Sequence, residues 1–284
     1  MKIVAGLGTI EDYEAYAEAG ADELFIGYVP YNWQKNYELA MPLNRREVSF
    51  VNVNVGSQSE MEILAKKVDK YKIPVTIAIN ALNYNPKLYP EIINIVEECK
   101  EYGFERFIVA DMGLLLALQS YFEVDSKIKN SRIKIHASGE IGEMNSYLIS
   151  MLRELGVNRI IYHRGARLKD IKSMIEKNPD MEHEVFYMNE NCHFTGGYCN
   201  SIHCDELIPM CKMPYCTDLK SENEYGLHNS DDYCFYKENS IIRHVSNLSQ
   251  IGVTHIKIVG RGASDDRMIE CIKSARKEIE GCQR

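Results

Sequence analysis

The chain has 284 residues, a formal net charge of −8 and a hydrophobic content of 45%, and 26% of its residues are charged. These values are typical of a globular protein with a sizeable core, and the negative charge disfavours broad nucleic-acid binding, although it does not exclude a local basic groove. No apolar run approaches the roughly 18 residues of a membrane span. The opening MKIVAGLGTIEDY reads as a strand and not as a secretion signal, so we expect a cytoplasmic protein without membrane contact.

Short apolar or β-branched runs alternate with amphipathic stretches along the first part of the chain. Thr9 is a plausible N-cap of the first helix, because acidic residues follow it in the first turn, and Gly20 is placed to end that helix. Strands are predicted at 3–6, 23–28, 48–55, 75–80 and 107–110, and helices at 9–19, 59–71, 90–102 and 113–121.

The same alternation continues to the end of the chain. Strands are predicted at 133–137, 159–162, 184–188 and 255–259, and helices at 145–155, 168–177, 241–250 and 265–279. About eight β-then-α units imply a parallel sheet covered by helices, and we predict a (β/α)8 TIM-type barrel that forms one domain over 1–284. A doubly wound open sheet is the alternative, but the chain carries no Gly-rich phosphate loop of the GxGxxG or P-loop form.

In such a barrel the chemistry sits at the carboxyl ends of the strands, which we call the mouth. Any single polar residue there is most simply explained by a hydrogen bond to a loop, and it is the convergence of many that predicts a site. The polar residues at predicted strand ends are Tyr28, Asn54, Asn80, Asp111, His136, His163, Arg164, Asn189 and Arg261. The aromatic segment 28–37 contains Trp33 and is either a lid that stacks on an aromatic substrate or the cover of a loop core.

Six of the nine cysteines fall between residues 192 and 234, in a loop at 190–236 that follows the seventh predicted barrel strand. Thiols gathered on a loop indicate disulfides, zinc or an iron–sulfur cluster. The expected reducing compartment and the odd number of cysteines argue against disulfides. Cys211 and Cys216, like Cys199 and Cys204, are separated by four residues, the upper end of the spacing usual in zinc sites, and the other neighbouring cysteines are further apart, so the pattern favours iron–sulfur chemistry over zinc. Outside this loop, Cys99, Cys271 and Cys282 are expected to be simple buried or surface thiols.

Four stretches of the chain resemble the collagenase-like peptidase family U32. They are AGLGTIEDYEAYAEAGADELFIG, HASGEIGEMNS, EVFYMNENCHFTGGYC and HIKIVGRG, and together they span nearly the whole length. The resemblance implies a [4Fe–4S] cluster held by Cys192, Cys199, Cys216 and Cys234. The spare thiols Cys204 and Cys211 compete for a ligand position, and Cys211 is the chief rival of Cys216.

The resemblance also implies an activity. Better understood members resemble oxygen-independent hydroxylases that act on ubiquinone precursors, transfer RNA and ribosomal RNA. We therefore expect an anaerobic, cluster-dependent redox enzyme with an aromatic or nucleobase-like substrate. The sequence has neither a GxSxG elbow nor an HExxH helix, which speaks against a peptidase. Val259 stands where the family usually has a glutamate, which makes the usual substrate or mechanism less secure here.

Arg164, Lys257 and Arg261 are expected to give the mouth a basic lining that holds an anionic small substrate, such as a carboxylate or a prephenate-like oxygen donor. Two alternatives stay open: a subunit that works only with a homologous partner or as a homodimer, and a true peptidase. The full set of predicted substrate-binding residues is Tyr28, Trp33, Asn80, His136, Arg164, Lys257 and Arg261.

Overall fold

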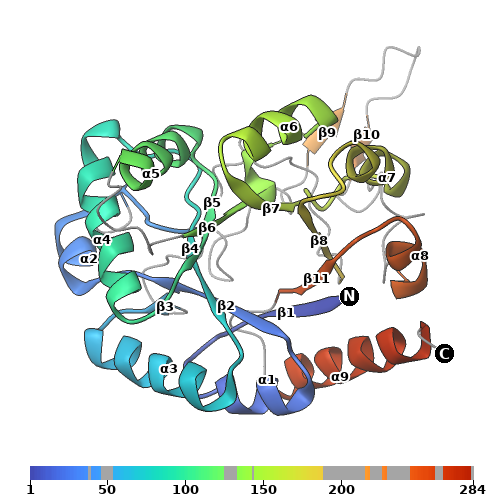
Figure 1. Cartoon of the computed structure of the whole chain (residues 1–284), viewed down its shortest axis with the longest axis horizontal. Coiled ribbons are helices and arrows are strands. Elements are labelled where there is room, and N and C mark those ends of the chain that lie inside the picture. The colour runs from blue at the N-terminus through green and yellow to red at the C-terminus, as the bar shows by residue number, and fades with distance from the viewer. Residues whose placement is uncertain are drawn as a thin grey trace.

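The computed structural model describes residues 1–37, 40–45, 54–124, 133–142, 144–187, 215–217, 226–228, 244–259 and 265–282. Eight parallel strands form a closed ring, in which the first strand pairs with both the second and the last (Figure 1). The ring strands are β1 (Lys2–Gly6), β2 (Glu23–Tyr28), β4 (Val75–Ile79), β5 (Arg106–Val109), β6 (Lys134–Ala137), β7 (Val157–Ile161), β8 (Glu182–Phe186) and β11 (His255–Ile258). This arrangement confirms the predicted TIM-type barrel.

Helices surround the ring of strands on its outside (Figure 1). Two 3-10 turns, η2 (Pro86–Leu88) and η3 (Gly139–Ile141), precede α4 and α6. The helices are α1 (Tyr13–Ala19), α2 (Tyr31–Tyr37), α3 (Gln58–Tyr71), α4 (Tyr89–Glu101), α5 (Met112–Val124), α6 (Ser146–Glu154), α7 (Leu168–Lys177), α8 (Val245–Gln250) and α9 (Asp265–Cys282). None of these described helices is long and apolar enough to cross a bilayer.

The structure describes only the end of the predicted strand at 48–55. Only β3 (Asn54–Val55) is described, and it pairs with Gly27 and Tyr28 at the end of β2. Residues 48–53 lie outside the described part. Because β3 only extends the edge of β2, β8 is the seventh strand of the ring, and the cysteine-rich segment follows it in the chain.

The first helix begins later than the sequence predicts. It starts at Tyr13, and the Asp12 carboxylate accepts a hydrogen bond of 3.0 Å from the Thr9 backbone N–H. Thr9 is therefore a turn residue, and its prediction as an N-cap is wrong. The hydrogen bond between Asp12 and Thr9 closes a turn over residues 9–12, and helix α1 begins only after that turn.

The first strand is joined to the last helix by a charged contact. The Asp22 carboxylate accepts a 2.7 Å hydrogen bond from the Ile3 N–H and pairs with the guanidinium of Arg276 on α9. Arg276 also donates to the Gly20 carbonyl, and Gly20 has φ +105 with the Arg276 Nε only 3.2 Å from where a Cβ would lie. Glycine is required there because an L side chain would be strained and crowded. The Gly-Ala-Asp sequence thus ties the last helix to the first strand and the loop that follows α1.

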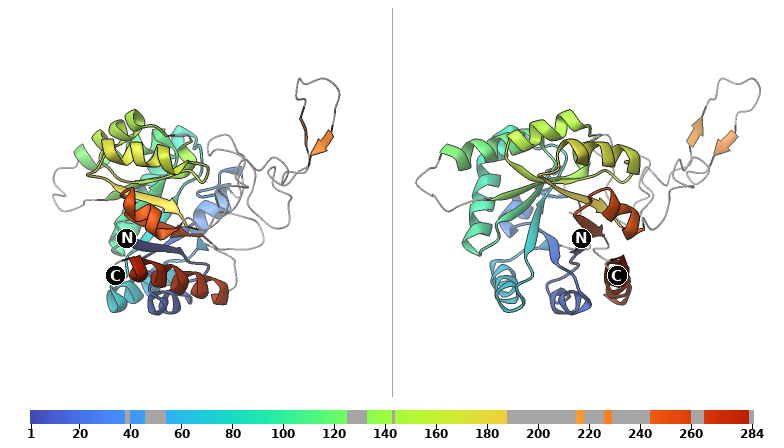
Figure 2. Two further views of the ribbon diagram at one scale, coloured as in Figure 1. Left: turned by 90° about the vertical axis from the view of Figure 1, so that its right-hand side faces the viewer. Right: turned by 45° about the vertical axis from the view of Figure 1, so that its right-hand side comes forward.

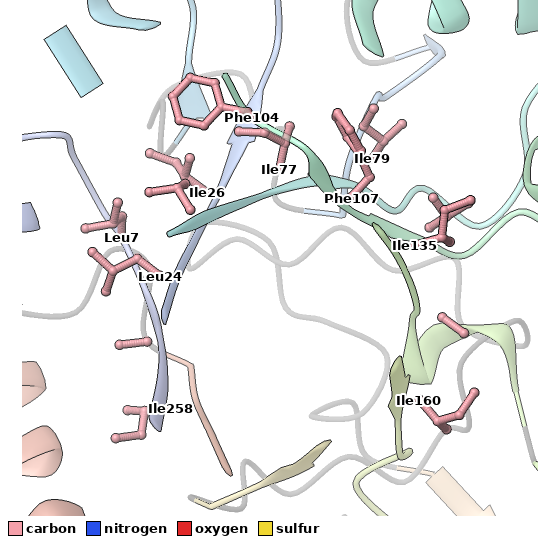
Figure 3. Close-up of a cluster of buried hydrophobic side chains, with 14 of the residues drawn as sticks. Leu7, Leu24, Ile26, Ile77, Ile79, Phe104, Phe107, Ile135, Ile160 and Ile258 are labelled. Atoms are coloured by element: carbon pink, nitrogen blue, oxygen red, sulfur yellow. The ribbon is translucent and has the colours of Figure 1, made fainter. Parts of the chain in front are cut away.

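The apolar core has two parts. The larger part lies outside the ring, where alternate strand residues such as Leu24, Ile77 and Ile160 stand toward the helices (Figure 3). A smaller set lies on the opposite, inner face, and we call it the apolar layer; it consists of Val4, Phe25, Ile108, Ile161 and Phe186. The alternation of strand side chains separates the two sets.

Candidate functional site

A short segment at the mouth is held in place by two side chains, one from α2 and one from the loop after β4. Trp33 donates from Nε1 to the Met41 carbonyl at 2.9 Å, and the Tyr84 hydroxyl donates to the Leu43 carbonyl at 2.6 Å. These bonds fix residues 40–45 beside the strand ends. The segment therefore delivers Arg45 to the mouth in a defined position.

Two arginines converge on one carboxylate there. Glu140, on η3 after β6, lies 3.7 Å from the Arg45 Nε and 3.9 Å from the nearest Arg164 nitrogen. All three side chains are largely buried, with 12–19% of their surface exposed. Guanidinium forks match the geometry of carboxylate and phosphate oxygens. The two arginines therefore bring groups that bind anions to this part of the mouth.

Arg164 also marks the start of the cysteine-rich segment. Its guanidinium carbon lies 4.2 Å from the ring centroid of Phe186, the last residue of β8. Stacking on an aromatic ring is a common placement for arginine. The positive charge therefore stands at the point where the chain leaves the barrel toward Cys192.

The mouth is closely packed at the end of β2. A Cβ on Gly27 would lie 2.0 Å from the Asn54 Oδ1 and 2.5 Å from the Asn44 Nδ2. These two buried amides are joined by a 3.1 Å hydrogen bond. Glycine is required at this inward position of β2 because the amides occupy the space of a side chain.

Below the mouth, the barrel interior holds an ionic network of Glu23, Arg159, Glu184 and Lys257. Arg159 donates to both Glu23 and Glu184 at 2.8–2.9 Å, and the Lys257 Nζ donates to Glu184 at 2.8 Å. The network has two positive and two negative charges and is buried throughout. Such pairing is what makes buried charge tolerable.

The network shifts the protonation of its members. Burial alone would raise the pKa of Glu184, but the Lys257 and Arg159 charges lower it to about 2. Burial would likewise raise the pKa of Glu23, and Arg159 holds it far below its ordinary value. Both carboxylates are therefore ionised at neutral pH.

Three of the predicted substrate-binding residues have structural contacts instead. The Tyr28 hydroxyl points outward and donates to Glu98 on α4 at 2.7 Å. Trp33 is 1% exposed beneath residues 40–45, which matches the alternative of a cover over a loop core. Lys257 lies 3.9 Å from the Phe25 ring centroid, and its inward strand position places it beside Glu184, with which it forms an ion pair.

Two of the others lie nearer to the strand ends. The Asn80 Oδ1 accepts from the Arg45 N–H at 3.3 Å, so it supports the mouth segment, and Arg164 lies at the mouth itself. His136 points into the barrel and is 1% exposed. Burial and the nearby Arg159 charge lower the pKa of His136, so its ring is neutral at physiological pH. Arg261 lies outside the described residues.

Most of the predicted cluster ligands also lie outside the described residues, namely Cys192, Cys199 and Cys234, as do the rivals Cys204 and Cys211. Cys216 is in β9 (Tyr215–Thr217), opposite Leu227 of β10 (Gly226–His228), and this hairpin stands apart from the barrel in both views of Figure 2. Within the described ranges, no group of three His, Cys, Asp or Glu side chains is arranged to hold a metal ion. The ligand set stays a prediction.

One feature of the described residues is compatible with an iron–sulfur cluster. Arg164 stacks on Phe186, the last residue of β8, and a cluster ligated by thiolates is stabilised by positive charge near it. The cysteines would hold the group, which supplies one-electron chemistry when bound.

Arg45 and Glu140 were missed in the sequence. Arg45 lies in the run LNRRE, which has no strand or helix period, so nothing in the pattern placed it at the mouth. Glu140 was visible only as part of HASGEIGEMNS. The signal that identifies both is spatial, since they come from different loops of the barrel and meet only after it closes.

Two curated proteins that are similar to this chain are named for tRNA hydroxylation. The chain is 22% identical over 98% of its length to tRNA hydroxylation protein P of Escherichia coli, of which it spans 68%. It is 24% identical over 98% of its length to tRNA hydroxylation protein P1 of Bacillus subtilis, of which it spans 63%. It thus covers about two thirds of each of these relatives.

Solved structures share the fold. The U32 peptidase Mk0906 superposes with a TM-score of 0.53 at 11% identity, covering 92% of this chain and 93% of that one. An oxaloacetate acetylhydrolase gives a TM-score of 0.51 at 10% identity, with 98% and 80% covered. The family model for peptidase family U32 matches residues 8–283, and the chain therefore belongs to peptidase family U32.

Proposed function

We propose that this chain is an iron–sulfur-dependent enzyme that hydroxylates, or otherwise modifies by redox chemistry, a nucleobase of transfer RNA. The observation that carries the proposal is similarity over 98% of the chain to two proteins named for tRNA hydroxylation. The net charge of −8 means that RNA must be recognised at a restricted basic surface.

We assign this role to the mouth. Arg45 and Arg164 face the shared Glu140 at the strand ends, and guanidinium groups are the side-chain groups that match phosphate and carboxylate oxygens. We assign these arginines to an anionic group of the reactants, either an RNA phosphate next to the modified base or the carboxylate of an anionic co-substrate. Arg261 is proposed as a further member. Tyr28, Trp33 and Lys257 are not assigned to substrate binding. Their side chains are already held by a hydrogen bond to Glu98, a hydrogen bond to the Met41 carbonyl and an ion pair with Glu184, respectively.

Mass spectrometry of tRNA nucleosides tests the proposal. We expect tRNA from cells without the gene to lack a nucleoside that is one oxygen atom heavier than its parent, and wild-type protein to restore it. Arg164→Ala should weaken RNA or co-substrate binding by on the order of ten- to a hundred-fold, the value of a lost hydrogen bond to a charged group. Arg167→Ala is the matched control, because Arg167 is exposed and pairs only locally with Asp170.

The outcomes separate the three candidate activities. Identical nucleosides with and without the gene would overturn the proposal. Modification that requires a homologous second protein would support a partner-dependent subunit. Peptide cleavage that persists after iron is removed would support a peptidase.

A further inference from the structure

An exposed surface on α2 takes no part in the packing of the barrel. Helix α2 begins shortly after β2 ends, and its Trp33 side chain packs inward with 1% of its surface exposed. Tyr31, by contrast, has 69% of its surface exposed. The exposed side chains of this helix, which we call the α2 face, are those of Tyr31, Asn32, Gln34, Lys35 and Asn36. Within the described ranges, none of the five has a side-chain hydrogen bond or an ion pair.

The helix itself is firmly held. The Tyr37 hydroxyl donates to Glu91 on α4 at 2.7 Å, and Figure 1 shows α2 beside α4. Tyr37 also packs against Trp33, with ring centroids 4.6 Å apart. Trp33 in turn donates to the Met41 carbonyl at 2.9 Å, on the segment that carries Arg45 to the mouth. The α2 face is therefore fixed relative to that segment.

The chemistry of the α2 face favours a nucleic acid. The face combines an aromatic ring, an ammonium group and three amides, and α2 has no acidic residue although the whole chain has a net charge of −8. Tyr31 and Lys35 stand at positions i and i+4 of the helix, so they lie on the same side of it. Proteins bind single-stranded RNA by stacking bases on aromatic side chains and by pairing phosphates with cations. Lysine is depleted from the cores of protein–protein interfaces, so a protein partner fits this face less well.

We propose that the α2 face binds a single-stranded segment of the RNA substrate, in which one base stacks on Tyr31 and a phosphate pairs with Lys35. The inference rests on the proposed function, because it takes RNA as the substrate and adds a place where part of it binds outside the mouth. Because Trp33 holds the segment that carries Arg45, the same strand can continue toward the mouth. Tyr31 and Lys35 are binding residues and not catalytic ones, so they contribute affinity and leave the chemical step unchanged.

Binding of tRNA, isolated from cells that lack the gene, to the whole chain purified without oxygen tests the proposal. Tyr31→Ala should weaken binding about five- to a hundred-fold, the value of one lost base stack. Tyr31→Phe keeps the ring and should bind like wild type. Tyr147→Ala is the matched control, because Tyr147 is 81% exposed beside Lys177 but lies on α6, far from α2 in Figure 1. Its affinity should be unchanged.

The salt dependence of binding separates the two contacts. Each phosphate contact with a single strand contributes about 0.7 to the slope of log K against log salt. Lys35→Ala should therefore reduce the slope by about 0.7, and Tyr31→Ala should leave it as in wild type. At saturating tRNA, both variants should restore the modified nucleoside at the wild-type rate, because neither side chain touches the reacting base.

Four results would overturn the proposal. Wild-type affinity in Tyr31→Ala would do so and, where wild-type protein still restores the nucleoside, would leave the proposed function standing. Wild-type protein that does not bind tRNA would overturn both. Equal losses in Tyr31→Ala and Tyr31→Phe would exclude stacking. A wild-type dimer that Tyr31→Ala dissociates, seen by size-exclusion chromatography with light scattering, would assign the face to a second copy of the chain.

Discussion

Replacing Glu184 with Gln removes the carboxylate that two buried cations share. Glu184 is fully buried, accepts from Arg159 and Lys257 at 2.8 Å, and is the carboxylate that pairs with the Lys257 Nζ. Arg159 keeps Glu23 and Glu182 after the change, whereas Lys257 is left buried without that ion pair. The substitution is therefore expected to act chiefly through Lys257.

The magnitude follows from the protonation of Glu184. Lys257 and Arg159 outweigh the effect of burial and lower its pKa from 4.5 to about 2. At about 1.4 kcal/mol per pKa unit, this corresponds to about 3 kcal/mol in favour of the ionised form. Removing one partner of a buried ion pair costs about 3–5 kcal/mol, so we expect the free energy of unfolding at pH 7 to fall by an amount of that order. Because the pKa is depressed in the folded state, this contribution is present above pH 4.5 and disappears as the pH falls toward 2.

Urea unfolding of Glu184→Gln against wild type measures the loss. Asp170→Asn is the control, since it breaks an exposed pair with Arg167 and should cost less than about 1 kcal/mol. Adding Lys257→Met to Glu184→Gln should recover part of the stability, because it removes the unpaired cation. A Glu184→Gln protein within 1 kcal/mol of wild type, or a double variant less stable than the single one, would refute the buried network.

Three further predictions concern other parts of the molecule. Burial and Arg159 lower the pKa of His255 to about 4. The neutral ring therefore contributes its full free energy of stabilisation above pH 6.5, and this contribution is lost as the pH falls from 6.5 to 4. Thermal melts of His255→Gln should show a flatter pH dependence over that range. Gly27→Ala should lower the melting temperature and weaken anion binding, because its Cβ meets the Asn54 Oδ1 at 2.0 Å; equal melting temperatures would contradict this. Iron removal should abolish visible absorption and leave the far-UV circular dichroism of the barrel in place.

The barrel was predictable because its signals are local. The helix at Leu168–Lys177 was placed to the residue from its apolar period, and the order of strands and helices followed from alternation alone. The predicted strand 48–55 is not one of the eight ring strands, because its described end, Asn54–Val55, pairs only with the end of β2.

The site was less predictable because it depends on side-chain direction. Tyr28 and Lys257 both sit in strands that reach the mouth, yet Tyr28 points outward to Glu98 and Lys257 points inward to Glu184. A one-residue difference in position reverses the face of a strand. Arg45 could not be placed at all before Trp33 and Tyr84 were seen to hold its segment.

We propose that this U32 barrel carries a redox cluster on the cysteines of its loop. The most direct test is the iron and acid-labile sulfide content of protein purified without oxygen, together with its visible spectrum. We predict about four of each per chain, with broad visible absorption that is lost in Cys192→Ala and retained in Cys282→Ala, a change at an exposed thiol on α9. Zinc in place of iron, or equal spectra for the two variants, would contradict the claim.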